Sequence, residues 1–110
     1  MPVIDKNIFD TLKESTGEEF VLELLTAFFD DAPLQFALLK SAIASNDTET
    51  FRRAAHTLKS NGATFGALEF AALARELEMM GRDKNLEVGN RLDVLQEAYE
   101  QMKIQLDELK

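Results

Sequence analysis

The sequence predicts an all-α fold, an antiparallel up-down four-helix bundle with a short extra helix at its N-terminus. Apolar residues recur at helical spacing in five segments, and none of the chain shows the alternation of a half-buried strand. Five Gly and two Pro in 110 residues are too few for the many tight turns of an all-β domain. The polar segments between the helical patterns are short, which favours antiparallel neighbours.

Size and composition indicate one soluble domain over residues 1–110. Apolar residues make up 45% of the chain and charged residues 29%, as in ordinary globular proteins. The absence of Cys excludes disulfides, thiolate metal sites and cysteine catalysis, and it fits a reducing compartment. No apolar run approaches the ~20 residues of a membrane span, and the first residues lack the pattern of a secretory signal. We therefore expect no membrane insertion and a cytoplasmic location.

The net charge of −8 argues against binding to nucleic acid. Such binding needs clustered Lys and Arg to neutralise phosphate. Solubility alone explains an acidic chain. A basic partner, or a local basic patch on an acidic body, is the functional alternative.

The first two helices are expected at Asp5–Glu14 and at Glu18–Ser45. In the first, Asp5 is a candidate cap, and apolar residues follow at four-residue spacing. Ser15 and Thr16, each followed three residues later by Glu, resemble a capping box that would start the second helix. Helical spacing continues past Pro33, which predicts one long bent helix, with a break at Pro33 as the alternative.

The second helix carries an apolar stripe wider than one packing seam needs. Its members are Phe20, Val21, Leu24, Leu25, Phe28 and Phe29. Either the helix is buried on two sides, or part of the stripe stays exposed for docking.

A third helix begins near Asn46 and Asp47, both suitable as caps, and carries the only histidine, His56. At 100° per residue its apolar residues share one face, and His56 projects about 140° away from that face. The core face comprises Phe51, Ala54, Ala55, Leu58, Gly62 and Phe65. Arg52, Lys59, Ser60 and Ala63 share the side of His56. His56 is therefore predicted to be exposed.

Two more helices complete the chain, expected at about Ala67–Met80 and Leu86–Leu109. Gly66 is expected to end the third helix in the left-handed conformation, and Gly81 to stop the fourth. The last helix has a heptad seam made of Val88, Leu92, Leu95, Tyr99, Met102, Leu106 and Leu109. This seam predicts packing within the bundle, with dimerisation as the alternative.

The residues around His56 argue against several kinds of catalytic or metal site. Ser60 lies one turn away, but a Ser–His pair on a helix surface has no oxyanion hole. One His, without Cys or a nearby acidic residue on its own helix, makes a poor metal site, and no Gly-rich phosphate loop is present. An imidazole beside Lys59 and Arg52 could accept a phosphoryl group, which the cations would stabilise. Spacing alone nevertheless favours an incidental surface histidine.

Residues 55–67, AHTLKSNGATFGA, resemble the signature of histidine-containing phosphotransfer (HPt) domains. The likeness extends to the Gly17-Glu18-Glu19 helix start, to Asp47 and to Leu77-Glu78, and so covers nearly the whole chain. It implies a four-helix bundle with a short extra helix. It also implies that the histidine accepts phosphate from a receiver-domain aspartate and passes it to another receiver.

When the functional residues of the family are assigned to this sequence, the resemblance implies that His56 is the phosphoacceptor, through its outer ring nitrogen. It also implies that Lys59 holds the phosphoryl oxygens. Glu78 matches a Gln that hydrogen-bonds the imidazole in some relatives, and would orient the ring. Ser60 departs from the Gly usual in the family. The chain would be a carrier rather than an enzyme. It would bind no cofactor or metal of its own, with Mg²⁺ supplied by the receiver.

The implied partners are response-regulator receivers and a hybrid histidine kinase, with the chain itself a monomer. The docking candidates are Arg52, Ser60, Gly62 and Ala63 near His56, and Ile8, Leu12, Val21, Leu25 and Phe29 on the first two helices. Two alternatives stay open. One is an adaptor bundle without phosphotransfer, and the other is the phosphoacceptor domain of a chemotaxis-type kinase.

Overall fold

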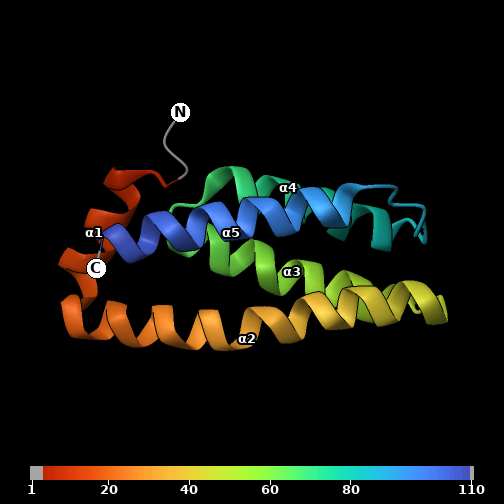
Figure 1. Ribbon diagram of the computed structural model, residues 1–110, viewed down its shortest axis with the longest axis horizontal. Coiled ribbons are helices and arrows are strands. Elements are labelled where there is room, and N and C mark those ends of the chain that lie inside the picture. Colours follow the sequence, from red (N-terminus) through yellow and green to blue (C-terminus); the bar gives the residue numbers. More distant parts are fainter. Residues whose placement is uncertain (1–3, 110) are drawn as a thin grey trace.

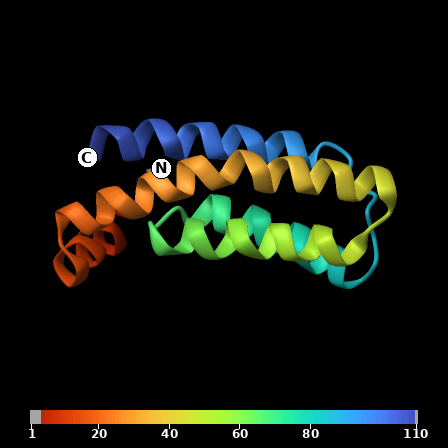
Figure 2. The same cartoon turned by 90° about the horizontal axis from the view of Figure 1, so that it is seen from below.

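The computed structural model describes residues 4–109, which form five helices and no strand. They are α1 (Lys6–Thr16), α2 (Glu18–Ser45), α3 (Thr48–Thr64), α4 (Leu68–Arg82) and α5 (Arg91–Leu109). Successive helices from α2 to α5 run in opposite directions, and α1 lies across the end where α2 begins (Figures 1 and 2). The predicted bundle with its extra N-terminal helix is confirmed.

The corner between α1 and α2 differs from the prediction. Ser15 and Thr16 form no capping box; they lie inside α1, where their hydroxyls donate to main-chain carbonyls one turn earlier. Gly17 separates the helices with a φ of 89°, and no side chain caps α2. Serine and threonine near a helix end can bond backward as well as cap forward, and the sequence alone did not distinguish the two.

The α2 helix has the predicted bounds and passes through Pro33 without a break. It ends at Asn46, whose φ of 56° is left-handed and whose backbone N–H donates to Ile43 and Ala42. Asp47 then caps α3 by accepting from the Thr50 N–H at 3.1 Å. Asn46 therefore ends one helix, and Asp47 begins the next.

Gly66 joins the α3–α4 turn to α1. Its φ is 83°, as predicted, and its carbonyl accepts from the Asp5 N–H at 2.8 Å. A Cβ at this position would lie 2.8 Å from the Asp5 carbonyl oxygen. Only glycine therefore fits both the turn and the contact with the chain entering α1.

The last two helix boundaries were predicted wrongly. Gly81 does not stop α4 but lies buried within it, and the helix continues to Arg82. The last helix begins at Arg91 rather than Leu86, because Gly89 has a φ of 58° that no right-handed helix accommodates. Val88 belongs to the preceding loop, yet it is only 6% exposed, which explains why it fitted the apolar pattern.

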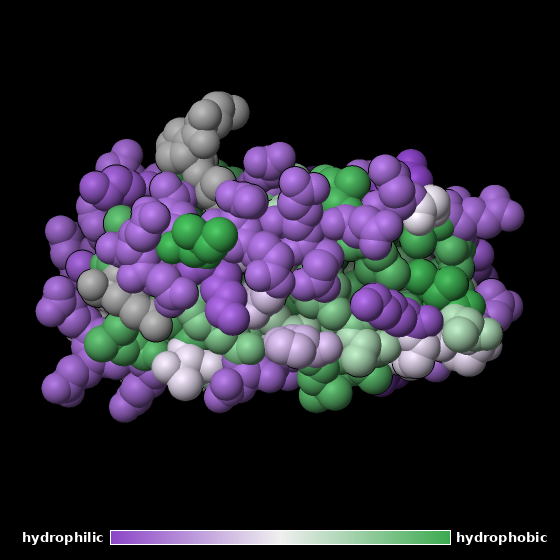
Figure 3. All heavy atoms as spheres, viewed as in Figure 1, coloured by the Kyte–Doolittle hydropathy of each residue, from purple (hydrophilic) through white to green (hydrophobic). Residues whose placement is uncertain are grey.

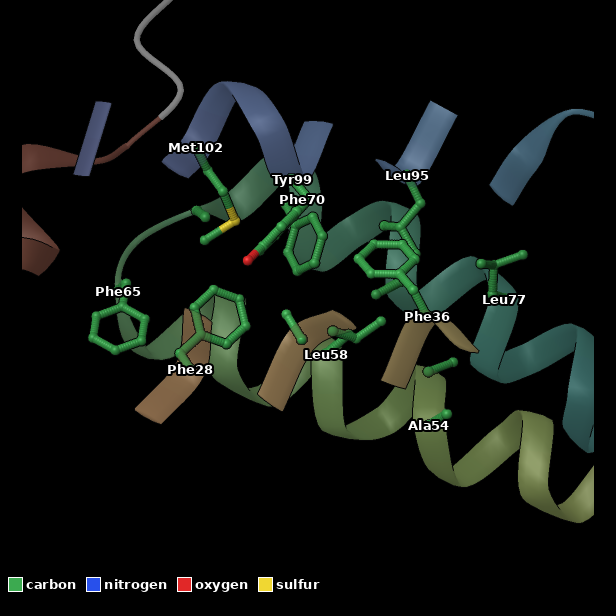
Figure 4. Close-up of a cluster of buried hydrophobic side chains, with 14 of the residues drawn as sticks. Phe28, Phe36, Ala54, Leu58, Phe65, Phe70, Leu77, Leu95, Tyr99 and Met102 are labelled. Carbon is green, nitrogen blue, oxygen red and sulfur yellow. The ribbon is translucent and has the colours of Figure 1, made fainter. Parts of the chain in front are cut away.

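Aromatic rings from α2, α4 and α5 meet in the centre of the bundle (Figure 4). The Tyr99 ring centroid lies 5.8 Å from that of Phe28, 5.6 Å from that of Phe36 and 6.2 Å from that of Phe70. On α5, the buried seam consists of Leu95, Tyr99, Met102 and Leu106. The heptad pattern thus serves packing within the chain, as predicted.

The α3 and α4 helices approach closely where glycines face their neighbours. A Cβ on Gly62 would lie 2.6 Å from Cδ1 of Phe70, and one on Gly81 would lie 3.1 Å from Cδ1 of Phe51. Real side chains cannot occupy the first of these positions without moving the Phe70 ring. Glycine at both places therefore sets how near α4 comes to α3.

Replacing Gly62 by Ala should lower the free energy of unfolding by about 1 kcal/mol. The added methyl forces the buried Phe70 ring to move, and overpacking of this kind costs about 1–3 kcal/mol. The better helix propensity of Ala offsets up to about 1 kcal/mol of that cost. Urea unfolding followed by circular dichroism measures the difference.

Ser60→Ala is the matched control, because Ser60 is exposed on the same helix. Its stability should equal or slightly exceed that of the unsubstituted protein. A Gly62→Ala variant as stable as this control would show that α3 and α4 have room to spare at this contact.

Candidate functional site

His56 lies in the middle of α3 with its side chain 53% exposed, which confirms the prediction of exposure. The helical register produces this orientation, because Ala55 and Leu58 on either side of His56 point into the core at 0% exposure. Lys59, one turn later, is partly covered at 28% exposure.

Glu78 of α4 connects these two residues. Its Oε2 lies 2.8 Å from His56 Nδ1, and its Oε1 lies 2.8 Å from Lys59 Nζ. Glu78 is 4% exposed, and among residues 4–109 it is the one buried charged side chain. A buried carboxylate needs partners, and here α3 supplies both of them, one for each oxygen.

The electrostatics of the pair fix the state of the imidazole. Burial acts strongly to raise the pKa of Glu78, but the hydrogen bonds from Lys59 and His56, with the positive charges of both, hold it below its ordinary value. Glu78 is therefore ionised at neutral pH and can only accept hydrogen bonds. His56 Nδ1 must donate, so Nε2 of the neutral ring keeps its lone pair on the exposed side.

Further cations stand one turn before His56. Arg52 Nη2 donates to Glu49 Oε1 at 2.5 Å, and Arg53 Nε donates to the same oxygen at 3.2 Å. These hydrogen bonds, that from Arg52 foremost, lower the pKa of Glu49 to about 2.

The charge of α3 sets it apart from the rest of the chain. Its three cationic side chains outnumber its one carboxylate, which makes it the only described helix with a net positive charge, in a chain of net charge −8. The helix that carries His56 is thus basic in a chain that is acidic overall.

No group of three or more His, Cys, Asp and Glu residues is arranged to hold a metal ion in the part of the chain that the structure describes. Within residues 4–109, no helix combines the length and the apolar character needed to cross a bilayer. On the face seen in Figure 1, hydrophilic side chains predominate, and apolar atoms show along α2 and toward the end of the bundle that holds the α4–α5 connection (Figure 3).

The predicted docking residues fall into two groups. Ser60 and Ala63 are exposed on α3 beside His56, and Arg52 is partly exposed. The assignment of Gly62 to the docking surface is wrong, because its α-carbon faces Phe70 in the core.

Two candidates on α2 are wrong for the same reason: Val21 is 2% exposed and Leu25 is fully buried. Ile8, Leu12 and Phe29 are partly buried. Ile8 packs at Gly66, in the turn that follows the end of α3.

The sequence pointed to Glu78 on α4 but not to the exposed apolar residues of that helix. Met79, next to Glu78 in the chain, is 47% exposed, and Leu68 is 49% exposed. Arg75 lies one turn before Glu78. Leu68 and Met79 do not share the helix face of the core residues Phe70 and Leu77. Their position off that face could have predicted from the sequence that they are exposed.

Comparison with known proteins agrees with this geometry. A family model described as "Hpt domain" matches residues 23–110. The phosphorelay protein LuxU of Vibrio cholerae is 28% identical over 102 residues, covering 88% of this chain and 90% of that protein.

Histidine-containing phosphotransfer protein B (HptB) of Pseudomonas aeruginosa PAO1 has a similar structure. The TM-score is 0.84 with 23% sequence identity, over 97% of this chain and 93% of that one. This likeness concerns the fold, and it confirms the helical bundle. The family match covers most of the chain, and the protein belongs to the Hpt domain family of histidine phosphotransfer domains, which act in phosphorelays.

Replacing Glu78 by Ala should shift the neutral His56 ring toward the tautomer with its hydrogen on Nε2, because the acceptor that holds the Nδ1 hydrogen is lost. Nitrogen-15 NMR of the imidazole, at a pH where the ring is neutral, measures the tautomer ratio. Glu78→Gln is the control, since its amide oxygen can still accept from Nδ1 and should preserve the original tautomer. An unchanged ratio in the Ala variant would contradict the assigned role of Glu78.

Proposed function

We propose that His56 carries a phosphoryl group between receiver-domain aspartates in a phosphorelay. One observation carries the proposal: in a chain of the Hpt domain family, the exposed imidazole has Nδ1 bound to a buried carboxylate and its Nε2 lone pair facing outward. Nε2 is then the nucleophile, and the opposite nitrogen is already paired with a negative charge.

Transfer proceeds by in-line displacement. The Nε2 lone pair attacks phosphorus of the receiver's aspartyl phosphate; the P–N bond forms as the P–O bond to the aspartate breaks, and the carboxylate leaves with the electron pair. The imidazole gains positive charge as the bond forms, and the Glu78 carboxylate at Nδ1 stabilises that charge. The reverse sequence delivers the group to a second receiver.

This chain supplies the acceptor and a basic surface, while the receiver supplies Mg²⁺ and its acidic pocket. We infer that the chain binds no cofactor or metal of its own and acts as a carrier rather than as an enzyme. Lys59, 2.8 Å from Glu78, lies beside the ring and contributes positive charge where the phosphoryl oxygens arrive. We expect the exchange to take place in the cytoplasm.

The receiver is proposed to dock over the α3–α4 face around His56. The net positive charge of α3 complements an acidic receiver pocket. Ser60 and Ala63 are small and exposed, which leaves room above the imidazole, and Met79 and Leu68 add apolar contacts from α4. The name of the Vibrio relative, a phosphorelay protein, supports a place in a phosphorelay.

The decisive experiment is phosphate uptake from a panel of receiver domains, each charged with acetyl phosphate and Mg²⁺. Wild-type protein should acquire an acid-labile, base-stable phosphate, and His56→Gln should acquire none while keeping its helical circular dichroism. Labelling of the His56→Gln variant would refute the proposal. Tight receiver binding without uptake by the wild type would instead support an adaptor bundle.

Lys59→Ala should slow transfer from the best receiver by about tenfold or more, as loss of a charge-assisted contact to the transferring group does. The free energy of unfolding should fall by about 1–3 kcal/mol, because the buried Glu78 carboxylate then keeps only His56 as a partner. Rapid-quench kinetics and urea unfolding separate the two effects. A normal transfer rate in the Lys59→Ala variant would show that Lys59 does not stabilise the transferring phosphoryl group.

A further inference from the structure

Arg52 stands one turn before His56 and is held away from it by an exposed carboxylate. Its Nη2 donates to Glu49 Oε1 at 2.5 Å and its Nε to Glu49 Oε2 at 3.3 Å, a two-point contact within one helix. The side chain is 31% exposed, against 72% for Arg53, which shares the same carboxylate.

The geometry points to Arg52 as a second phosphoryl ligand, one that Glu49 holds in reserve while His56 is unphosphorylated and releases when a phosphoryl group occupies Nε2. This inference rests on the proposed function and adds to it a residue and a switch. In the resting protein Lys59 is paired with Glu78 and Arg52 is paired with Glu49.

Helix geometry aims His56 toward Arg52. Side chains on an α-helix lean toward its N-terminus, so the imidazole covers the turn that holds residue 52. Residues four apart have Cβ atoms about 5–6 Å from each other. Arg52 also lies within electrostatic range of Glu78: its pKa is raised mainly by the hydrogen bond to Glu49, and the charge of Glu78 contributes as well.

Burial decides which of the two ion pairs opens. Glu78 is 5% exposed at its side chain, and if Lys59 left it, a buried carboxylate would retain only His56. The Glu49 side chain is 53% exposed, so water screens its pairing with Arg52 and solvates the carboxylate when the pairing breaks. The pair that can open at little cost is therefore the one containing Arg52.

Glu49 does not lose every partner in the exchange, because Arg53 remains 3.2 Å from its Oε1. The phosphoryl group brings about −1.5 to −2 charges and three acceptor oxygens. A guanidinium fits such oxygens at two points, with a geometry that an ammonium lacks. Arg52 thus exchanges a screened carboxylate for a more highly charged, better matched acceptor.

A ligand that binds only the phosphorylated form shifts the transfer equilibrium toward that form. At equilibrium with a phosphorylated receiver, Arg52→Gln should lower the ratio of phosphohistidine to receiver phosphate about three- to tenfold. Glu49→Gln should raise that ratio. Arg53→Gln is the matched control, and should change it less than twofold. If the ratio of phosphohistidine to receiver phosphate falls equally in the Arg52→Gln and Arg53→Gln variants, Arg52 contributes only general positive charge. That result would overturn the inference.

A second measurement needs no receiver. Phosphoramidate phosphorylates histidine directly, and nitrogen-15 NMR of the guanidinium groups then follows Arg52 and Arg53 before and after the reaction. The Arg52 Nε–H signal should shift on phosphorylation, and it should shift more than the Arg53 signal, because Arg53 stays on Glu49. A stationary Arg52 signal on a fully phosphorylated protein overturns the inference. A shifted Arg52 signal in a protein that no receiver can charge supports it and refutes the proposed relay function instead.

Discussion

The close approach of α4 to α3 is the constraint on which the rest of the site depends. A glutamate side chain is short, and it reaches across to His56 and Lys59 because the two helices meet with glycine at Gly62 and Gly81 in place of larger side chains. The carboxylate that results is buried and ionised, with one oxygen on each cationic partner. From it follow the tautomer of the imidazole, the outward lone pair at Nε2 and the fixed position of Lys59.

Much of the fold was predictable because it follows from local rules. The spacing of the apolar residues predicted five helices. The caps at Asp5 and Asp47 and the left-handed turn at Gly66 lie at the positions that the sequence predicted. The errors arose where one residue type serves two purposes. Gly81 resembled a helix end but fills a narrow contact between helices, and Val88 fitted a helical seam although Gly89 delays the helix that follows.

The candidate site was predictable on α3 and only partly beyond it. Projection of the residues around the helix axis put His56 on the side away from the core. This works within one helix because the position of a residue in the sequence fixes the direction of its side chain. Contacts between helices depend on their rotation and separation, which periodicity does not fix. Periodicity therefore did not predict the contact with Glu78, which only the family resemblance suggested. It also did not predict the burial of Val21 and Leu25, because a wide apolar stripe is compatible with an exposed docking surface.

Every charged group that touches the site lies between Glu49 and Glu78, in a single helical hairpin formed by α3 and α4 (Figure 1). The remaining helices cover the apolar side of that hairpin, and the hydrogen bond of His56 within the described residues goes to Glu78 of α4. The reacting groups and the proposed docking residues are consequently encoded together in one contiguous hairpin. Substitutions on the surfaces of α1, α2 and α5 can therefore accumulate during evolution while the reacting groups stay unchanged.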